Sequence, residues 1–525
     1  MKKIKWILFA AVALSIAAIM ILSIADENAS LPNVSVLSDE EYAAILSAQA
    51  ETDPLVSAGQ LLLDGAAAPY GSGKYLLSET ESLNHLLSRL QWSKRGRKAY
   101  LVPESELYDF MGAVSAGHVF HLLVTNGRKY FTERVVVTSL PVLILEDDAK
   151  LKYKTGSTDD CAMMRLFTPE GDTVESICSY RLRGGSSLRH PKQSYRVTLY
   201  GGRHRKQALS LLGMRESKDW ILLPLYTDRS RMREKVALDL WNTLAASNPA
   251  HDVAGSSFEY VEVIRGGIYS GLHGLVTPLD EIQCGVSGNS DARLYKVIEY
   301  MWEYVRENYL LDRRALSEVI ELKYPASKAA DSSAWEPMYR YVDAALIDGA
   351  DTAALSALMD EQNLIDHALY LAVCSAVDNT FKNVYYLWRA DASGEYRFTK
   401  IPWDLNYTFG DTHDSGSELR TAFSEEMITR VIRPDDLDML TSGDGGEALL
   451  ARIAARYAEL RETVFDTDRL IGAFEKQQSL LLRSGVYVRE GERWGSSELS
   501  ADLDEINRFI TEHMAVLDEY YGYSA

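Results

Sequence analysis

The sequence is poor in cysteine and in positive charge, and each shortage excludes a class of protein. Of 525 residues only four are cysteines, and none of them has the spacing of metal ligands. Asp and Glu outnumber Lys and Arg by 75 to 55, so the net charge is −20. A general nucleic-acid binder would show a basic surface, and we therefore expect no nucleic-acid partner. Any anionic ligand would need local cations or metal to overcome this acidic field.

Two of the four cysteines flank a predicted β-hairpin. Cys161 and Cys178 would lie nearly opposite one another across a turn at residues 169–172. Outside the cell such a pair can form a disulfide. The alternative is two buried free thiols, because cysteine is among the most frequently buried residue types. The sequence leaves both possibilities open.

A basic start precedes an apolar run at the N-terminus. Residues 7–25 contain no charge, and lysines stand directly before them. This is the layout of an export signal, and the run approaches the length of a membrane span. The lysines would stay in the cytoplasm, which places the chain after Asp26 outside. No cysteine follows the run, which argues against a lipoprotein. We expect residues 1–25 to be a signal peptide or a membrane anchor.

The remaining chain is long enough for two or more domains, with 46% hydrophobic residues to build their cores. Residues 26–139 mix helical and strand patterns, and we interpret them as a small accessory α+β region. Strands predominate from residue 140 and helices after about Trp302, which favours an α+β fold with a sheet-rich and a helical part. We expect the main domain over residues 140–470, with C-terminal helices packed on it over 471–525.

A glycine-rich basic loop and a helix are predicted before residue 250. The loop, RGGSSLRHPKQSYR from Arg183 to Arg196, joins two predicted strands. Glycine lets backbone N–H groups approach a phosphate, and lysine or arginine supplies charge. A solvated hairpin loop would look similar, so the loop alone is weak evidence. Residues 228–246 have helical spacing, with Asp228 as the expected N-cap.

A helix followed by a hairpin is predicted between residues 363 and 401. Residues 363–377 place apolar side chains at helical spacing. Residues 384–388 and 396–401 read as the two strands of a hairpin, and the sequence DASGE between them is a turn. Polar residues gather at the open end of this hairpin, before its first strand and after its second.

These polar residues have the layout of a phosphoryl-transfer site. Asp378, Lys382 and Asn383 precede the hairpin, and Asp404 follows it. One acid can orient a hydroxyl, an amide and a second acid can hold metal, and a lysine can neutralise the moving phosphate. The separation of Asp378 from Asn383 matches the acid-to-asparagine spacing in the catalytic loop of protein kinases. Each residue alone could instead be a cap or turn residue, since Asp and Asn favour such positions.

Four stretches of the chain together resemble the CotH kinase family, which is named for a bacterial spore-coat protein. They are the loop from Arg183 to Arg196, the segment from Trp220 to Arg233, the sequence GIYSGLH from Gly267, and the segment from Asp378 to Gly410. They cover about residues 140–470, and their order and spacing make the match specific. The family has an atypical protein-kinase-like fold, so the resemblance implies a two-lobed α+β architecture.

The resemblance also implies a reaction, namely transfer of phosphate from ATP, with Mg²⁺ or Mn²⁺, to Ser or Thr hydroxyls of a surface or secreted protein. By position, Asp378 and Lys382 would be catalytic, and Asn383 and Asp404 would bind metal. The residues expected to bind the nucleotide are Lys192, Arg183, Ser186 and Lys296. The chain would then be a kinase tethered to a bacterial membrane with its domain outside, or a secreted kinase if the signal is cleaved.

Three positions depart from the family pattern. Gly185 stands where an asparagine is common, Thr277 where a glutamate is usual, and Asn406 where an acid is frequent. A catalytically inactive structural or adhesive surface protein on the same fold is therefore the alternative interpretation. A hydrolase using Asp378 and Asp404 as paired carboxylates ranks last, because the neighbouring lysine and asparagine have no obvious role in glycoside hydrolysis.

Overall fold

The computed structural model divides the chain into two compact units. The first ends at Val142 and takes in Phe167–Thr173, and the second comprises Leu143–Leu166 and the chain from Val174 onward. The predicted signal or anchor over residues 1–25 lies outside the described residues. Within the described stretches, no helix is long and apolar enough to cross a membrane. The structure describes residues 31–54, 58–104, 118–248, 253–298, 302–346, 351–380, 382–391, 393–411, 435–495 and 503–524.

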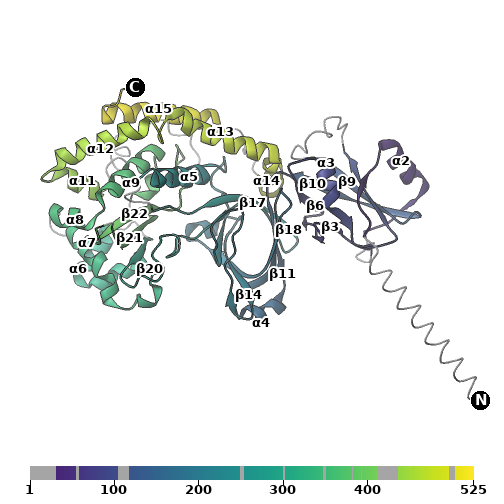
Figure 1. Ribbon diagram of the computed structural model, residues 1–525, viewed down its shortest axis with the longest axis horizontal. Coiled ribbons are helices and arrows are strands. Elements are labelled where there is room, and N and C mark those ends of the chain that lie inside the picture. The colour runs from purple at the N-terminus through teal and green to yellow at the C-terminus, as the bar shows by residue number, and fades with distance from the viewer. Residues whose placement is uncertain are drawn as a thin grey trace, which may run out of the picture. The chain divides into compact units, whose positions relative to one another are not determined.

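The first unit contains a mixed sheet, a small second sheet, and the helices α2 and α3 (Figure 1). The main sheet has the order β1-β8-β9-β10-β6-β5, with β2 pairing to β10, and the small sheet has the order β4-β3-β7. Successive residues of β9, Leu122, Leu123 and Val124, are all buried, so the sheet is covered on both faces. The bounds are β1 (Ser35–Val36), α2 (Asp39–Ala48), β2 (Ala50–Glu51), β3 (Leu61–Leu63), β4 (Ala66–Ala67), β5 (Tyr70–Gly71), β6 (Lys74–Ser78), α3 (Leu83–Arg89), β7 (Leu90–Trp92), β8 (Lys98–Pro103), β9 (Val119–Thr125) and β10 (Lys129–Thr138).

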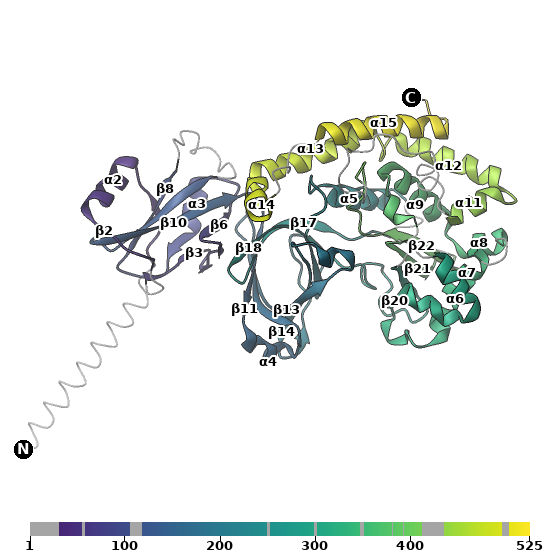
Figure 2. The same cartoon turned by 180° about the vertical axis from the view of Figure 1, so that it is seen from behind.

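The second unit begins with a sheet that closes on itself. Its order is β13-β12-β11-β17-β18-β16-β14-β15, and β13 also pairs with β14. Side chains from these strands, among them Leu145, Met164 and Trp220, form one buried cluster, so this core lies inside the curved sheet (Figure 2). The bounds are β11 (Val142–Asp147), α4 (Lys152–Thr155), β12 (Asp160–Phe167), β13 (Thr173–Arg183), β14 (Ser194–Gly202), β15 (Arg205–Lys206), β16 (Asp219–Leu223), α5 (Arg233–Ala246), β17 (Phe258–Arg265) and β18 (Ile268–Val276).

A four-stranded antiparallel sheet and a set of helices complete the second unit. The sheet has the order β20-β19-β21-β22. Helix α9 packs on β22, and α5, α12 and α15 pack on α9, while α13 runs beside α15 (Figures 1 and 2). The bounds are β19 (Arg293–Val297), α6 (Trp302–Leu311), β20 (Ile320–Tyr324), α7 (Glu336–Leu346), α8 (Thr352–Leu358), α9 (Glu361–Cys374), β21 (Val384–Ala390), β22 (Tyr396–Pro402), α11 (Asp435–Ser442), α12 (Gly446–Arg461), α13 (Thr467–Ser484), α14 (Val486–Trp494) and α15 (Leu503–Tyr521).

The predicted α+β class is confirmed, and so are the predicted helix and hairpin. Helix α9 ends at Cys374 rather than at Val377, because Ser375 has a left-handed backbone with φ 52° that stops the helix. The strands β21 and β22 pair antiparallel, with Val384 opposite Pro402. The local periodicity was therefore sufficient to place the segment that carries the polar residues.

The predicted start of α5 is wrong. The helix begins at Arg233, its N-cap is Met232, and Asp228 forms a turn ahead of it. The Asp228 carboxylate accepts hydrogen bonds from the backbone N–H groups of Ser230 at 2.9 Å and of Arg233 at 2.8 Å. Arg233 also pairs with it through Nη1 at 2.8 Å. Asp228 thus anchors the helix from upstream instead of capping it.

Cys161 and Cys178 are both free and buried, so the structure realises the alternative of two buried thiols. Burial raises the pKa of Cys178 to about 12, which keeps this thiol protonated at neutral pH. The pair therefore contributes to packing rather than to covalent cross-linking.

Candidate active site

The hairpin of β21 and β22 places Asn383 and Asp404 at the same end of the sheet. Val384 on β21 lies opposite Pro402 on β22. Asn383 directly precedes Val384, and Asp404 lies two residues after Pro402. The Trp403 backbone N–H donates a hydrogen bond to the Asn383 carbonyl oxygen at 2.9 Å. The two residues predicted to bind metal are thus fixed on neighbouring backbones.

Asn379 holds these two backbones together, and sequence reasoning gave it no role. Its side-chain Nδ2 donates to the carbonyl oxygens of Asn383 at 3.2 Å and of Trp403 at 2.7 Å. Asn379 is fully buried, so both bonds are shielded from water. The side chain acts as a clamp between the loop before the hairpin and the segment after it.

Asn383 and Asp404 both have left-handed backbone conformations, with φ 59° and 63°. Asn and Asp tolerate this region better than other non-glycine residues, since their short polar side chains can hydrogen-bond locally. Such conformations persist only where the surroundings hold them in place. The Asn379 clamp and the hairpin register supply that restraint.

Asp378 lies on the short 3-10 helix η8 (Val377–Asn379), close to the amide of Asn383. The Asn383 Nδ2 donates to the Asp378 carboxylate at 2.8 Å. Lys382 precedes Asn383 in the same loop and is half-buried. Asp378 is half-buried and Asp404 is exposed, so solvent and small ligands can reach both acids.

Two of the predicted nucleotide-binding cations flank Trp403 from different sheets. Arg183 ends β13, and its guanidinium lies 5.6 Å from the Trp403 ring centre. Lys296 lies on β19, with its ammonium 5.9 Å from the same ring. Burial lowers the pKa of Lys296 to about 8, and the negative charge of Asp404 opposes this shift. Burial also lowers the pKa of Arg183, again opposed first by Asp404. Both cations therefore lie in the field of Asp404.

Glu234, in the first turn of α5, is a site residue that sequence reasoning missed. It is 3% exposed, and one of its carboxylate oxygens, Oε1, has no hydrogen-bond partner among the described residues. Burial, followed by the negative charge of Asp404, raises the pKa of Glu234 well above its ordinary range. An acid in a first helical turn is common, because it complements the helix dipole, so no sequence pattern pointed to this burial.

Tyr407 shows that the predicted acids converge. Burial raises the pKa of its hydroxyl, and the carboxylates of Asp411, Asp378 and Asp404 act in the same direction. A hydrogen bond with Thr227 opposes these effects. Asp378 and Asp404, which stand on either side of the hairpin in sequence, therefore act on one phenol in the fold.

Lys192 lies in a different buried cluster. Its ammonium pairs with both carboxylate oxygens of Glu490 on α14, at 2.8 and 3.0 Å, and also donates to the Leu272 carbonyl oxygen. Arg231 pairs with the same carboxylate at 3.2 Å. Burial lowers the pKa of Lys192 to about 8, with Glu490 opposing the shift. Ser186, on the same loop as Lys192, begins the 3-10 helix η3 (Ser186–Arg189).

The departures from the family pattern have ordinary structural surroundings. Asn406 donates through Nδ2 to the Thr227 hydroxyl at 3.0 Å. Thr277 is buried, and its hydroxyl accepts a hydrogen bond from the Ser257 backbone N–H at 2.9 Å. Gly185 is exposed and precedes η3. None of these contacts displaces Asp378, Asn383 or Asp404.

The residues gathered around Asp404 offer the groups that phosphoryl transfer needs. Carboxylate and amide oxygens are the donors that Mg²⁺ takes alongside phosphate oxygens, and the partnerless Glu234 oxygen fits a cation. Among the described residues, no three His, Cys, Asp or Glu side chains converge to hold a metal by themselves, so phosphate oxygens would have to complete its coordination. We refer to Asp378, Asn383, Asp404, Arg183, Lys296 and Glu234 as the Asp404 site.

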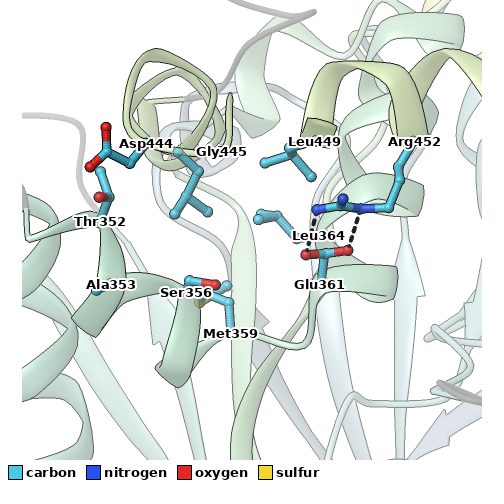
Figure 3. Close-up of a pocket in the computed structure, with 11 residues that line it drawn as sticks. Thr352, Ala353, Ser356, Met359, Glu361, Leu364, Asp444, Gly445, Leu449 and Arg452 are labelled. Atoms are coloured by element: carbon cyan, nitrogen blue, oxygen red, sulfur yellow. Dashed lines mark hydrogen bonds and ion pairs between the residues drawn. The ribbon is translucent and has the colours of Figure 1, made fainter. Parts of the chain in front are cut away.

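A separate pocket of about 320 Å³ lies between α8, α9, α11 and α12 (Figure 3). The ion pair of Glu361 and Arg452, at 2.8 and 3.0 Å, spans one side of it. The pocket lies at the start of α9, whereas Asp378 follows the end of that helix, about 20 Å away along its axis. Its described lining includes none of the predicted site residues.

The fold and the site define a mixed α+β protein in which acids, an amide and two cations gather near Asp404. A model of the CotH family, described as CotH kinase protein, matches residues 180–517, which is more than half of the chain. The chain therefore belongs to the CotH kinase protein family, and the resemblance drawn from the sequence is confirmed. The matched range begins in β13 and ends in α15. A comparison with curated proteins gave no match.

Proposed function

We propose that the chain is an ATP-dependent protein kinase that phosphorylates Ser or Thr hydroxyls of a surface or secreted protein. Family membership supports a kinase-like protein in general. The observation that carries the finer proposal is the convergence of Asp378, Asn383 and Asp404 with two cations, Arg183 and Lys296, around Trp403. Acids and cations in one accessible place are what a phosphate donor and a hydroxyl acceptor require together.

The proposed mechanism assigns a step to each group. Asp378 orients the acceptor hydroxyl and takes its proton as the oxygen forms a bond to the γ-phosphorus of ATP, while the bond from that phosphorus to the ADP oxygen breaks and ADP leaves. Arg183 and Lys296 neutralise the nucleotide phosphates, and Lys382 stabilises the transferred phosphoryl group. Asn383 and Asp404 would hold a divalent cation, Mg²⁺ or Mn²⁺, which would supply positive charge to offset that of the nucleotide phosphates.

Lys192 and Ser186 belong to the proposed nucleotide site through their loop, which joins β13 to β14. The ammonium of Lys192 is already held by Glu490, so Lys192 would reach a phosphate only by loosening that pair. For this reason we assign the principal phosphate contacts to Arg183 and Lys296.

The proposed architecture has two lobes, one formed by the closed sheet and the other by the four-stranded sheet with its helices. Arg183 comes from the first and Lys296 from the second, and both flank Trp403, which supports a site at the junction. The proposed location is the outer face of a bacterial membrane, with residues 1–25 as anchor, or the medium if that segment is cleaved.

A transfer assay with the full chain tests the function. The protein would be incubated with γ-labelled ATP, Mg²⁺ or Mn²⁺, and a library of Ser- and Thr-containing peptides. We expect metal-dependent labelling that is lost in Asp378→Asn and Asp404→Asn. Asp239→Asn removes an acid on α5 that pairs with Lys235 at 3.0 Å, outside the site, and should label like the wild type. Equal labelling in all variants would refute the proposal, and no labelling in any would favour the inactive surface protein.

A further inference from the structure

The carboxylate of Glu234 is placed inside the Asp404 site by the start of α5. The backbone N–H of Arg233 is bound by Asp228 at 2.8 Å, and the Arg233 guanidinium pairs with the same acid. These two contacts between Arg233 and Asp228 fix the first turn of α5. Glu234 directly follows Arg233 in that turn. Glu234 therefore faces inward with 3% exposure, although a first-turn acid ordinarily points to solvent.

One side of the Glu234 carboxylate is bound and the other is not. The backbone N–H of Leu405, the residue directly after Asp404, hydrogen-bonds to it. Its Oε1 is buried and has no hydrogen-bond partner among the described residues. A buried carboxylate oxygen without a donor is expensive, and native structures almost always satisfy such atoms with a partner, a water or an ion.

The charges around Glu234 show which partner is missing. Asp404 and Asp228 are the acids that act on it, and Arg183 is the cation that opposes them. Asp228 is already neutralised by Arg233 at 2.8 Å. Glu234 and Asp404 thus share the influence of one arginine, whose guanidinium also lies over Trp403. A divalent cation between the two acids would give both of them a partner and would favour the ionised form of Glu234.

We propose that Glu234 is a further metal-binding residue of the Asp404 site, contributing its Oε1 to the divalent cation that Asp404 and Asn383 hold. This inference rests on the proposed function, because the cation is the one that accompanies the nucleotide. Two carboxylates and an amide leave coordination positions to the phosphates. The site should therefore take Mn²⁺ much more tightly with nucleotide present than without it.

Titration of the full chain with Mn²⁺ tests the inference without relying on turnover. Free Mn²⁺ would be followed by electron paramagnetic resonance, with and without a non-hydrolysable ATP analogue. Relative to the wild type, Glu234→Gln should weaken Mn²⁺ binding in the analogue complex by about ten- to a hundredfold. Glu234→Asp, which keeps the charge one methylene further back, should show a smaller loss.

The control and the thermal unfolding curves separate the possible outcomes. Asp239→Asn removes one acid from the same helix and should bind Mn²⁺ as the wild type does. Glu234→Gln keeps the shape of the side chain and should unfold at a temperature no lower than the wild type without metal. Wild-type affinity in folded Glu234→Gln would overturn the inference and leave the proposed function standing. No analogue-dependent Mn²⁺ binding by the wild type would overturn both.

Discussion

Two charged clusters in the same unit differ in how completely their buried charges are partnered. In the cluster of Lys192, Arg231 and Glu490, both Glu490 oxygens are bound: Oε1 by Lys192 and the Leu272 backbone N–H, and Oε2 by Lys192 and Arg231. In the Asp404 site, Glu234 keeps an oxygen without a described partner. The carboxylate of the Lys192 cluster, the saturated cluster, therefore has no oxygen left to bind a ligand, whereas the Glu234 oxygen of the Asp404 site, the unsaturated one, could still accept one.

Backbone strain does not make this distinction. Arg231, in the saturated cluster, has φ 63°, as does Asp404 in the unsaturated one. Arg231 is held there by bonds from its guanidinium to the carbonyl oxygens of Leu225 and Asp228. Left-handed residues are thus tolerated wherever hydrogen bonds fix them, so the backbone conformation does not distinguish the two clusters.

The largest expected effect is on transfer, within the unsaturated site. Asp378→Asn should lower the rate of phosphoryl transfer by about 10²–10⁴-fold, because the acceptor hydroxyl loses its base. The amide can still accept from Asn383, so the urea midpoint should stay close to that of the wild type. Steady-state rates with a labelled peptide, alongside urea unfolding, measure both quantities. A large fall in stability would assign Asp378 to the fold instead.

The saturated cluster should show the opposite behaviour. Lys192→Met leaves Glu490 buried with one cation fewer and should destabilise the fold by about 3–5 kcal/mol. Glu490→Gln should also destabilise the fold, because it leaves Lys192 and Arg231 buried without their shared carboxylate, and the double variant should lose less than the sum of the two single losses. Urea unfolding of the two single variants and the double variant gives the coupling free energy between Lys192 and Glu490. If Lys192→Met were as stable as the wild type and lost only nucleotide affinity, the assignment of the Lys192–Glu490 pair to fold stability would be wrong.

Asn379 connects stability with the site and should give an intermediate effect. Asn379→Ala leaves the buried carbonyl oxygens of Asn383 and Trp403 without its amide, at a cost of about 1–3 kcal/mol. Because the clamp positions Asn383 and Asp404, Mn²⁺ affinity in the presence of an ATP analogue should fall as well. Destabilisation with unchanged Mn²⁺ affinity would show that the hairpin alone sets the site.

The last expected effect is on the pH dependence of stability, and it lies away from both clusters. His513 is buried, and burial lowers its pKa to about 4, below the ordinary value of 6.5. The unfolded state therefore takes up a proton first as pH falls from 6.5, and stability declines until about pH 4 by about 1.4 kcal/mol per pH unit. His513→Gln should flatten this slope in urea midpoints measured between pH 7 and 4. An unchanged slope would mean that other groups govern acid unfolding.

The sequence was sufficient for whatever depends on short-range patterns. Helical and alternating periodicity placed α9 and the β21–β22 hairpin, and so put Asp378, Asn383 and Asp404 on one loop system. Local reasoning fell short at two positions. Asp228 was expected to cap the helix but anchors it from upstream, and Glu234, to which the sequence analysis assigned no role, is enclosed.

Long-range pairing lay beyond any local pattern. Glu490 is 298 positions from Lys192, on an amphipathic helix whose other charged residues give no sign of which one turns inward. Without that partner, Lys192 in a glycine-rich basic loop is most simply taken as a phosphate contact. In the fold, Lys192 is held in an ion pair. Arg183 and Lys296 are instead the cations whose pKa values, lowered by burial, are raised by the charge of Asp404.

The most direct test of the unsaturated site is a thermal-shift titration of the full chain with ATP, with and without Mg²⁺ or Mn²⁺, beside Asp404→Asn. A ligand that binds only the folded state raises Tm by mass action. We predict a rise in Tm that requires both ATP and metal and that Asp404→Asn abolishes. No rise under any condition, or an equal rise in the variant, would contradict the account.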